Sequence, residues 1–181
     1  MIGKEILNYR IVSVLGKGGM GSVYIAEHTL INNERVAIKV INANMANDFT
    51  KSLLKDEAEH LAGLNHPNIV SFKNYHIDKE GNIYLIMEYA EGKNLEDFIK
   101  NVNGLVVEDR ICPLFEPILD AVGYAHKKKI LHCDIKPANV VITTEGVPKI
   151  LDFGIAKIIK NQGEEEKDNL IMGTPSYMSP E

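Results

Sequence analysis

Four polar residues in two short runs have the types and spacing that phosphoryl transfer requires. Asp134 and Lys136 lie in the run HCDIKPAN, which ends at Asn139, and Asp152 follows thirteen residues later in the triplet DFG. They supply a proton acceptor, a cation and two oxygen ligands for a metal ion. Such groups position a nucleophile and neutralise phosphate charge, and the reaction needs little covalent chemistry from the protein. Any single Asp or Asn is more often structural, but four polar residues at these spacings are hard to produce by chance.

Two strand-like runs, 140–142 and 149–151, flank and separate these motifs. Their apolar and β-branched residues predict a small hairpin. Asn139 directly precedes the first run and Asp152 directly follows the second. We therefore expect both motifs to lie at the ends of this hairpin and to face one cleft.

The first 90 residues have the pattern of an antiparallel sheet. Apolar and polar positions alternate in three segments of the first forty residues, which predicts three antiparallel strands, and two further strand-like segments joined by a turn follow. Between the third and fourth segments, apolar residues recur at helical spacing over 48–64 and predict an amphipathic helix that stops before Pro67. The five predicted strands are 9–15, 22–26, 35–41, 69–76 and 83–89.

The character of the chain becomes helical after these strands. Residues 91–93 predict a linker, 95–101 a short helix and 113–129 a longer one. An interior proline costs on the order of 3 kcal/mol, so Pro117 predicts that the longer helix starts late or is kinked. The polar segment 157–169 predicts a mobile loop.

A glycine-rich segment lies between the first two predicted strands. Gly16, Gly18 and Gly21 fit the pattern G-x-G-x-x-G-x-V, which Val23 completes. Glycine lets backbone amides come close to phosphates, so the segment would cover a nucleotide. A dinucleotide-binding turn shares this spacing but opens a helix, whereas a β-branched strand follows here. A plain glycine-rich hairpin is the structural alternative.

Composition limits the class of protein. With 181 residues, 45% of them hydrophobic, the chain is long enough for one domain or two small lobes. The net charge of −5 argues against a nucleic-acid-binding surface, which usually carries a basic excess. Cys112 and Cys133 are interpreted as reduced thiols in a cytoplasmic compartment. No apolar run approaches the roughly 20 residues that span a bilayer, so we expect no membrane contact by this segment.

Together these motifs resemble those of protein kinases. HCDIKPAN and DFG are similar to the catalytic-loop and metal-binding motifs, GKGGMGSV to the glycine-rich loop, and VAIK to the strand that carries the phosphate-binding lysine. The run GTPSYMSPE resembles the end of an activation segment, with SPE where the family usually shows APE. The residues within these motifs are most similar to those of bacterial kinases of eukaryotic, or Hanks, type. The resemblance covers the chain from about Tyr9 to Glu181.

The resemblance implies an α+β fold with two lobes. Residues 1–90 would form the nucleotide-binding N-lobe, with a five-stranded antiparallel sheet and one main helix. Residues 91–181 would form a partial, mainly helical C-lobe with the catalytic loop and activation segment. The implied activity is ATP- and Mg²⁺-dependent phosphoryl transfer to serine or threonine hydroxyls of a protein substrate. Lys136 and Thr174, the latter in Gly-Thr-Pro, are both typical of the serine/threonine branch.

The catalytic roles follow from the same resemblance. Asp134 would orient the substrate hydroxyl, and Lys136 and Lys39 would offset phosphate charge. Asn139 and Asp152 would hold Mg²⁺ through oxygen ligands, the hard donors that this ion prefers.

Lys39 lies among apolar residues on a predicted central strand. A lone strand lysine usually extends its ammonium to solvent, which is the structural alternative. The family's spacing identifies Glu57 as a carboxylate partner, whereas Glu59 is interpreted as a solvated charge. The glycine-rich segment in front of Lys39 and Glu57 behind it favour the functional interpretation.

Nucleotide contacts are also implied by the resemblance. Val23, Ala37 and Val141 would sandwich the adenine, and Met87 would lie at the back of its pocket. The backbone of the hinge from Glu88 to Ala90 would hydrogen-bond the base. The implied contacts are Gly16, Gly18, Gly21, Val23, Ala37, Lys39, Met87, Glu88, Ala90 and Val141.

His132 and Phe153 are implied to be packing residues. With Leu61 and Phe72 they would form an apolar column that joins the two lobes. A lone histidine in an apolar setting is usually structural, so we interpret His132 in this way and not as a metal ligand.

Cys133 departs from the family pattern, which usually has arginine here. That arginine receives the phosphate of a phosphorylated activation loop, and a thiol does not. Residues 157–173 contain no Ser, Thr or Tyr. We therefore hypothesise that loop phosphorylation does not switch this protein. The remaining hydroxyls to test are those of Thr174, Ser176 and Ser179.

Family catalytic domains normally continue with several helices beyond the position of Glu181. We expect that without such helices Ile118, Leu119 and Val122 are exposed or paired with something else, which favours partner binding or self-association. A chain of this length would then be poorly stable and weakly active. The alternative function is a truncated pseudokinase that acts as a nucleotide-binding or scaffold module. A small-molecule kinase of related fold is disfavoured by the platform-like run 173–181.

Overall fold

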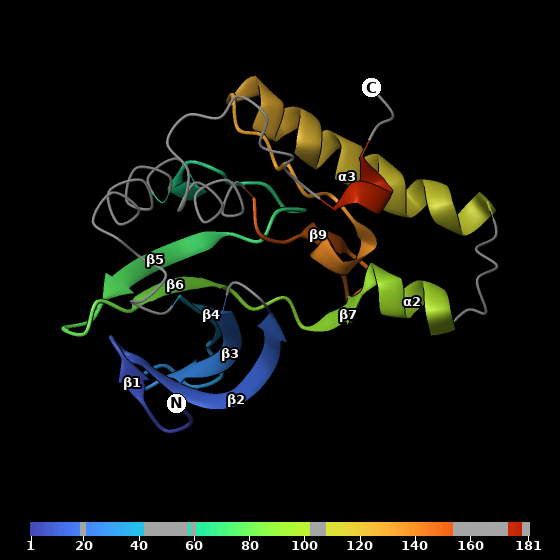
Figure 1. Cartoon of the computed structure of the whole chain (residues 1–181). Helices are drawn as coiled ribbons and strands as arrows, with labels where there is room; N and C mark the ends of the chain where they lie inside the picture. The colour runs from blue at the N-terminus through green and yellow to red at the C-terminus, as the bar shows by residue number, and fades with distance from the viewer. Residues whose placement is uncertain (19–20, 42–57, 59–60, 102–107, 154–173, 179–181) are drawn as a thin grey trace. The chain divides into compact units, whose positions relative to one another are not determined.

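The computed structural model describes residues 1–18, 21–41, 58, 61–101, 108–153 and 174–178. These residues form two compact units. The first contains the described residues of 1–63 together with 71–89, and the second contains those of 64–70 and of 90–178. Each unit is built around its own sheet (Figure 1).

The described part of the first unit contains one antiparallel sheet in the order β1-β2-β3-β4-β6-β5. The five predicted strands are present, but the prediction of five was one short. The missed strand is too short to show an alternating pattern and pairs only at the edge, through Glu5 with Arg10 and Ile6 with Tyr9. The strands are β1 (Glu5–Ile6), β2 (Tyr9–Gly18), β3 (Gly21–His28), β4 (Arg35–Ile41), β5 (Phe72–Ile77) and β6 (Ile83–Glu88).

The two faces of this sheet carry different residues, because successive side chains point to opposite sides of a strand. One face, called the core face below, packs as a hydrophobic core. It consists of Ile6, Ile11, Tyr24, Ala26, Val36, Ile38, Val40, Tyr84 and Ile86. The alternate positions of the same strands form the opposite face, called the Lys39 face below. β4 is central and is buried on both faces.

The second unit contains a sheet in the order β7-β8-β9, made of β7 (Gly92–Asn94), β8 (Val140–Thr143) and β9 (Pro148–Ile150). The predicted hairpin is confirmed as β8 and β9. The predicted linker at 91–93 is wrong, because residues 92–94 pair with β8. A Cβ at Gly92 would overlap the carbonyl oxygen of Ile142. This glycine therefore permits close strand pairing and does not mark a flexible connection.

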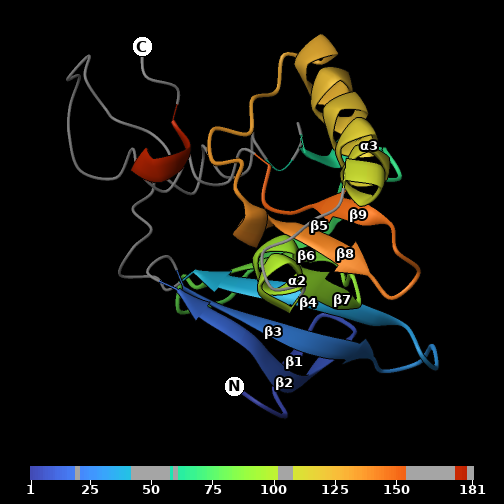
Figure 2. The same ribbon diagram turned by 90° about the vertical axis from the view of Figure 1, so that its right-hand side faces the viewer.

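Two helices accompany this sheet. Helix α2 (Leu95–Asn101) is confirmed with the predicted bounds, and Asn94 caps it by accepting the backbone N–H of Asp97 at 2.7 Å. Helix α3 (Glu108–Lys127) lies beside β9, as Figure 2 shows. It starts five residues before the predicted position and passes through Pro113 and Pro117, so the predicted late start is wrong, while the alternative of a kink at Pro117 stays a prediction. Its packing against the sheet overrides the local cost of proline.

The inner face of α3 explains a second correction. Ile118 is buried together with Ala121 and Ala125, which recur at helical spacing. Of the two outcomes expected for Ile118, exposure is therefore wrong, and pairing with another part of the chain agrees with its burial. Leu119 points away from this face with 68% of its surface exposed, as expected, and Val122 is half-buried.

Residues 64–70 belong to the second unit although they lie between strands of the first. Ile69 forms a parallel bridge with Ile150, and the Val70 N–H donates to the Ile150 carbonyl at 2.9 Å. Asn68 donates its side-chain amide to the Pro148 carbonyl at 2.8 Å and accepts the Ile150 N–H. These bonds use the backbone that was predicted to start a strand at residue 69, so β5 begins at Phe72.

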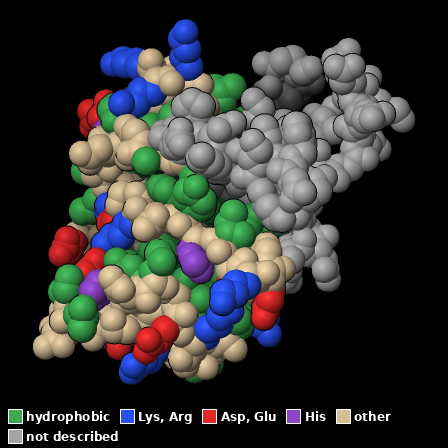
Figure 3. All heavy atoms as spheres, turned by 90° about the vertical axis from the view of Figure 1, so that its left-hand side faces the viewer, with side chains coloured by type: hydrophobic (Ala, Val, Ile, Leu, Met, Phe, Trp, Pro, Cys, Tyr) green, Lys and Arg blue, Asp and Glu red, His purple; other side chains and the backbone are tan. Residues whose placement is uncertain are grey.

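The predicted helix at 48–64 lies mostly outside the described residues, although 58, 61 and 62 are helical. The segment 157–169 lies wholly outside them. No helix in the described ranges is long and apolar enough to cross a membrane. On the face shown in Figure 3, basic, acidic and apolar side chains are interspersed among the coloured residues. One face does not test nucleic-acid binding, so its predicted absence stays a prediction.

Candidate active site

His132 organises the loop that leads to Asp134. The ring is 3% exposed, accepts the Asp134 backbone N–H at Nδ1 at 3.2 Å, and donates from Nε2 to the Leu151 carbonyl at 2.7 Å. Phe153 packs edge-on against it, with ring centroids 4.7 Å apart. Burial lowers the pKa of His132, so the ring is neutral and its tautomer is set by these two bonds. This geometry agrees with a packing role for His132, and the implied column with Leu61 and Phe72 stays a prediction.

Asp134 is the centre of a compact polar cluster. Lys136 lies with Nζ 2.8 Å from Oδ2 of Asp134, and the Thr174 hydroxyl donates to Oδ1 at 2.7 Å. Lys136 also donates to the same Thr174 hydroxyl at 2.8 Å, which closes a triangle of three side chains. Asn139 contributes a longer bond from Nδ2 to Oδ2 at 3.2 Å. Sequence spacing brings the loop residues together, but only the tertiary fold adds Thr174 from 40 residues away.

The charge state of Asp134 follows from these contacts. Partial burial by itself raises the pKa of Asp134, but hydrogen bonds from Lys136 and Thr174, and the Lys136 charge, outweigh it. The net effect holds this pKa below its ordinary value. The carboxylate is therefore ionised near neutral pH. A base of lowered pKa orients a hydroxyl well and removes its proton only late in a reaction.

Asn139 and Asp152 are held close together through the backbone. Asn139 ends the short 3-10 turn η2 (Pro137–Asn139), and its carbonyl accepts the Leu151 N–H at 2.9 Å, one residue before Asp152. The Asn139 amide nitrogen donates to the Asp134 carbonyl at 2.8 Å, so its oxygen is the atom with metal-binding lone pairs. Asp152 has φ of 54°, a backbone conformation that non-glycine residues rarely adopt.

This donor set fits a hard divalent cation. One amide oxygen and one carboxylate are the ligands that Mg²⁺ takes from proteins, with water or phosphate oxygens completing the octahedron. Within the described part of the chain, no three or more His, Cys, Asp or Glu residues cluster as a metal site. A protein cage of that kind, as a structural zinc ion would need, is therefore not present in the described ranges.

Cys133 lies between His132 and Asp134 with φ of 63° and a half-buried side chain. Its thiol is free of disulfide bonding. The cysteine side chain carries no positive charge, so this position offers no ion pair to a phosphate.

Four predicted nucleotide residues share the Lys39 face of the first sheet. Val23 is the Cα partner of Lys39, and Ala37 is the partner of Met87. Because Ala37 and Lys39 are two residues apart on β4, all four side chains point to one side. Lys39 is 8% exposed, so its aliphatic stem is packed within the sheet. Strand register therefore brings Val23 and Met87, which are distant in sequence, beside Ala37 and Lys39.

The glycine-rich segment closes the hairpin between β2 and β3. Gly16 is the partner of Val23, and Gly18 is the partner of Gly21 across the turn. Gly21 has φ of 135°, and a Cβ there would overlap the Val40 carbonyl oxygen. Gly16 has no described neighbour within 4 Å of an added Cβ. Gly21 is thus required by the fold, whereas Gly16 leaves open space beside the backbone.

For the remaining predicted residues the structure shows the contacts of Glu88 and the burial of Ala90 and Val141. The Glu88 N–H donates to the Ser71 carbonyl at 2.9 Å, and its carboxylate accepts the Ser71 N–H and hydroxyl at 3.2 Å. A base would therefore meet the Glu88 carbonyl and not its N–H. Ala90 is half-buried, and Val141 is buried in β8. Glu57 lies outside the described residues.

A comparison with protein-family models decides the family. The protein kinase domain model matches residues 9–181. The chain belongs to the protein kinase domain family. This kinase domain is 39% identical over its whole length to the serine/threonine-protein kinase PrkC of Bacillus subtilis, and 37% identical over 96% of its length to a probable serine/threonine-protein kinase PknB of Lactococcus lactis. It covers 28% and 27% of those two proteins.

Solved structures agree with this membership. The crystal structure of the Mycobacterium tuberculosis PknI kinase domain matches 92% of the chain with a TM-score of 0.73 and 26% identity, and the match covers 70% of that domain. A double mutant of the same domain matches 86% of the chain with the same TM-score and 29% identity. The kinase-like fold inferred from the motifs is therefore confirmed, including the antiparallel sheet of the first unit.

Proposed function

We propose that the chain carries out ATP-dependent phosphoryl transfer to serine or threonine hydroxyls of protein substrates. The single observation that carries this proposal is the triangle of Asp134, Lys136 and Thr174. It places an ionised carboxylate 2.7 Å from a hydroxyl oxygen, with an ammonium 2.8 Å from both partners. A substrate hydroxyl needs the same two groups, one to orient its proton and one to offset charge on the phosphoryl group.

Each residue of this triangle has a distinct role. Asp134 accepts a hydrogen bond from the attacking hydroxyl and takes its proton as the new oxygen–phosphorus bond forms, while the bond from the γ-phosphorus to the β–γ bridging oxygen breaks and ADP leaves. Lys136 neutralises the charge that collects on the transferred group. Thr174 holds both side chains in register, since its hydroxyl donates to Asp134 and accepts from Lys136. His132 sets the loop by fixing the Asp134 N–H and the Leu151 carbonyl.

The nucleotide and metal ion would be held by the remaining residues. Asn139 and Asp152 would bind Mg²⁺, which supplies positive charge to the phosphates when bound. Lys39 would contact the phosphates, with Glu57 as its proposed partner. Val23, Ala37, Met87 and Val141 would contact the adenine, and Glu88 and Ala90 would bond its edge. The glycines at 16, 18 and 21 would let backbone amides approach the phosphates.

Activation without loop phosphorylation is part of this proposal. Cys133 provides no cation for a loop phosphate, and Thr174 is already bonded to Asp134. A phosphate on Thr174 would place like charge against the Asp134 carboxylate, which disfavours the observed arrangement. Ser176 is exposed, so its hydroxyl is the next one to test for phosphorylation. A rate gain on phosphorylation of Thr174, Ser176 or Ser179 would contradict the proposal.

The test measures transfer of the ATP γ-phosphate to a generic protein substrate, with ATP binding followed in parallel. Asp134→Asn should lower the rate by about 10²-fold or more and leave ATP binding within a factor of about two. Asp120→Asn is the matched control, because the Asp120 side chain is 79% exposed on α3, where its carboxylate contacts His66 at 3.1 Å. It should leave the rate unchanged.

Two results would overturn the proposal. Phosphate found on tyrosine or on a small molecule, with none on serine or threonine, would change the substrate class. ATP binding by the parent chain with no phosphoryl transfer above the level of Asp134→Asn would favour the alternative, a nucleotide-binding or scaffold module.

A further inference from the structure

The N-terminal segment, residues 1–6, folds back over the core face of the first sheet. The Gly3 N–H donates to the Ile11 carbonyl at 2.8 Å, and the Ile11 N–H donates to the Lys4 carbonyl at 3.0 Å. Ile6 is 2% exposed and belongs to the hydrophobic core of that face. We call residues 1–6 the strap. It is an integral part of the sheet, because both its backbone and Ile6 are used in the fold.

Lys4 of the strap reaches a distant strand of the same sheet. Its Nζ donates to the Tyr84 hydroxyl on β6 at 2.8 Å and lies 5.1 Å from the Tyr84 ring centroid. β1 and β6 are four strand spacings apart in the sheet order, about 19 Å if the sheet were flat. A lysine side chain cannot span that distance. The contact therefore exists only because the sheet is strongly curled, as Figure 1 shows.

Asp78 binds both partners of the Lys4–Tyr84 contact. Its Oδ2 accepts the Tyr84 hydroxyl at 2.8 Å and the Lys4 ammonium at 3.3 Å. Its Oδ1 accepts the backbone N–H groups of Glu80 and Asn82 at 3.0 and 2.9 Å. Burial alone raises the pKa of Asp78, but hydrogen bonds from Asn82, Tyr84 and Lys4 hold it well below its usual range. The carboxylate is thus a fixed anchor for both the turn and the strap.

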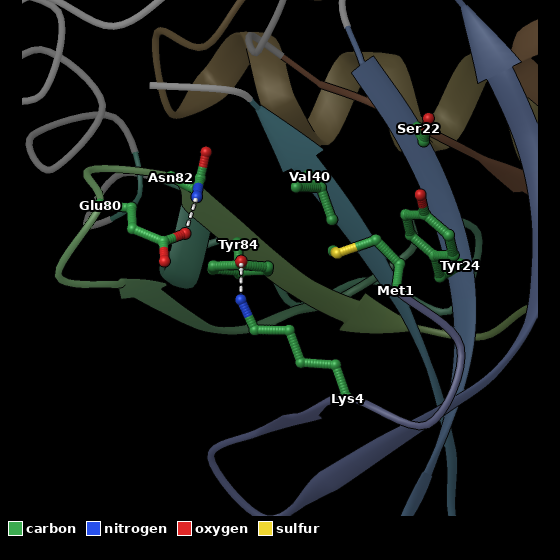
Figure 4. A pocket seen from close by; sticks show the side chains of 8 residues that line it. All are labelled: Met1, Lys4, Ser22, Tyr24, Val40, Glu80, Asn82 and Tyr84. Carbon is green, nitrogen blue, oxygen red and sulfur yellow. Dashed lines mark hydrogen bonds between the residues drawn. The ribbon is translucent and has the colours of Figure 1, made fainter. Parts of the chain in front are cut away.

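The rest of the core face is less tightly filled beside this anchor. A pocket of about 130 Å³ lies between Met1 and Lys4 of the strap, Val40 and Tyr84 of the sheet, and Asn82 of the turn before β6. In Figure 4 the Lys4 side chain extends to Tyr84 while Met1 points toward Val40 across the open space. At this end of the strap, the polar contacts of Lys4 therefore carry the closure.

We call the three linked residues Lys4, Asp78 and Tyr84 the clamp. The clamp contacts β6, which pairs with the strand that bears Lys39. Tyr84 is the Cα partner of Val40, and the next pair along is Lys39 with Leu85. β4 and β6 carry Val40 and Tyr84 on the core face and Lys39 and Met87 on the other. A change in the curl of these two strands would therefore alter how closely Val23, Lys39 and Met87 converge.

We propose that Lys4, Asp78 and Tyr84 are positioning residues for nucleotide binding, which act by holding the curl of the sheet that carries Lys39. This inference rests on the proposed function, because it assumes that the Lys39 face binds ATP. None of the three residues lies on that face. Their effect is transmitted through strand register and not through contact with the nucleotide.

The test uses the 181-residue chain with Lys4→Met and Tyr84→Phe. Tyr84→Phe keeps the buried ring and removes only the hydroxyl, so the core packing is retained. Both variants should raise the Kd for Mg²⁺–ATP about fivefold or more, with kcat at saturating ATP nearly unchanged. Backbone amides of Lys39 and Leu85 should exchange faster with solvent in the absence of nucleotide. Isothermal titration calorimetry and hydrogen exchange measure these effects.

Arg10→Met is the matched control. It removes an ion pair of the same strap, Arg10 with Glu5 at 2.7 Å, whose side chains are 60% and 51% exposed. It should leave both the Kd and the exchange rates unchanged. ATP binding equal to that of the parent chain in Lys4→Met and Tyr84→Phe would overturn the proposal.

A parent chain that binds no ATP would refute the proposed function instead. Hydrogen exchange would then test, independently of ATP binding, whether Lys4, Asp78 and Tyr84 hold the strand pair β4–β6. Unchanged exchange at Lys39 in Tyr84→Phe would show that the clamp does not set the strand pair.

Discussion

Thr174 shows how one hydroxyl can organise the polar cluster around Asp134. The motif Gly-Thr-Pro marks the residue in the sequence, but its bonds to both Asp134 and Lys136 appear only in the fold. Lys136 and Asp134 already attract each other through their charges. The Thr174 hydroxyl therefore mainly orients the two side chains. In our proposal, the substrate hydroxyl needs Asp134 and Lys136 in this same orientation.

We predict that Thr174→Val slows phosphoryl transfer by about tenfold or more, because Asp134 and Lys136 lose their shared partner. Thr174→Ser keeps the hydroxyl and should retain most of the rate. ATP affinity should be unchanged in both variants. Steady-state kinetics at saturating ATP test this prediction, and equal rates for the Val and Ser variants would contradict it.

His132 gives a prediction for pH. Burial lowers its pKa in the folded chain, whereas the unfolded chain has the ordinary value of about 6.5. Between these two values only the unfolded chain binds a proton at this ring. The contribution of His132 to stability is therefore full above about pH 6.5 and decreases as the pH falls below it.

Nuclear magnetic resonance of the histidine rings tests this directly. We expect the Nε2–H tautomer for His132 in the folded chain, and protonation at a lower pH than for histidine in the urea-unfolded chain. Protonation of His132 at the same pH in both states, or the Nδ1–H tautomer, would show that the bonds to Leu151 and Asp134 are absent in solution.

At the scale of elements, glycine positions separate fold from function. Gly21 combines a φ of 135° with a Cβ position that overlaps the Val40 carbonyl, whereas Gly16 has open space. We predict that Gly21→Ala lowers the free energy of unfolding by about 1–3 kcal/mol. Gly16→Ala should change it by no more than about 0.5 kcal/mol. Urea denaturation compares the two, and similar losses in both variants would contradict the prediction.

The elements also show where local patterns were sufficient. Alternating strands and the helix α2 were predicted from the sequence because one buried face imposes a clear period. β1 and β7 were missed because two or three residues cannot show a period. The start of α3 was misplaced because the proline penalty is local, whereas the burial of Ile118, Ala121 and Ala125 is tertiary.

At the scale of the whole molecule, exposed apolar side chains gather on the outer side of α3. Phe115 and Leu119 are 48% and 68% exposed. Such surface favours association with another protein surface. We predict that Leu119→Gln lowers concentration-dependent self-association of the chain, because Leu119 is the most exposed large apolar side chain described on this helix.

Sedimentation velocity across a range of concentrations measures this effect. Leu30→Gln is the comparison, since Leu30 is 83% exposed in the first unit. Loss of association in Leu30→Gln with none in Leu119→Gln would place the self-association surface on the first unit.

The sequence by itself determined the family of this protein and motivated the proposed chemistry. Asp134, Lys136, Asn139 and Asp152 are close along the chain, so their types and spacing were enough to indicate phosphoryl transfer and the kinase family. The tertiary structure alone decided the contacts made over long separations: Thr174 on Asp134, Lys4 on Tyr84, and Val23 opposite Lys39. Such contacts depend on strand register and on the curl of a sheet. These are set by the packing of the whole core, which no short pattern encodes.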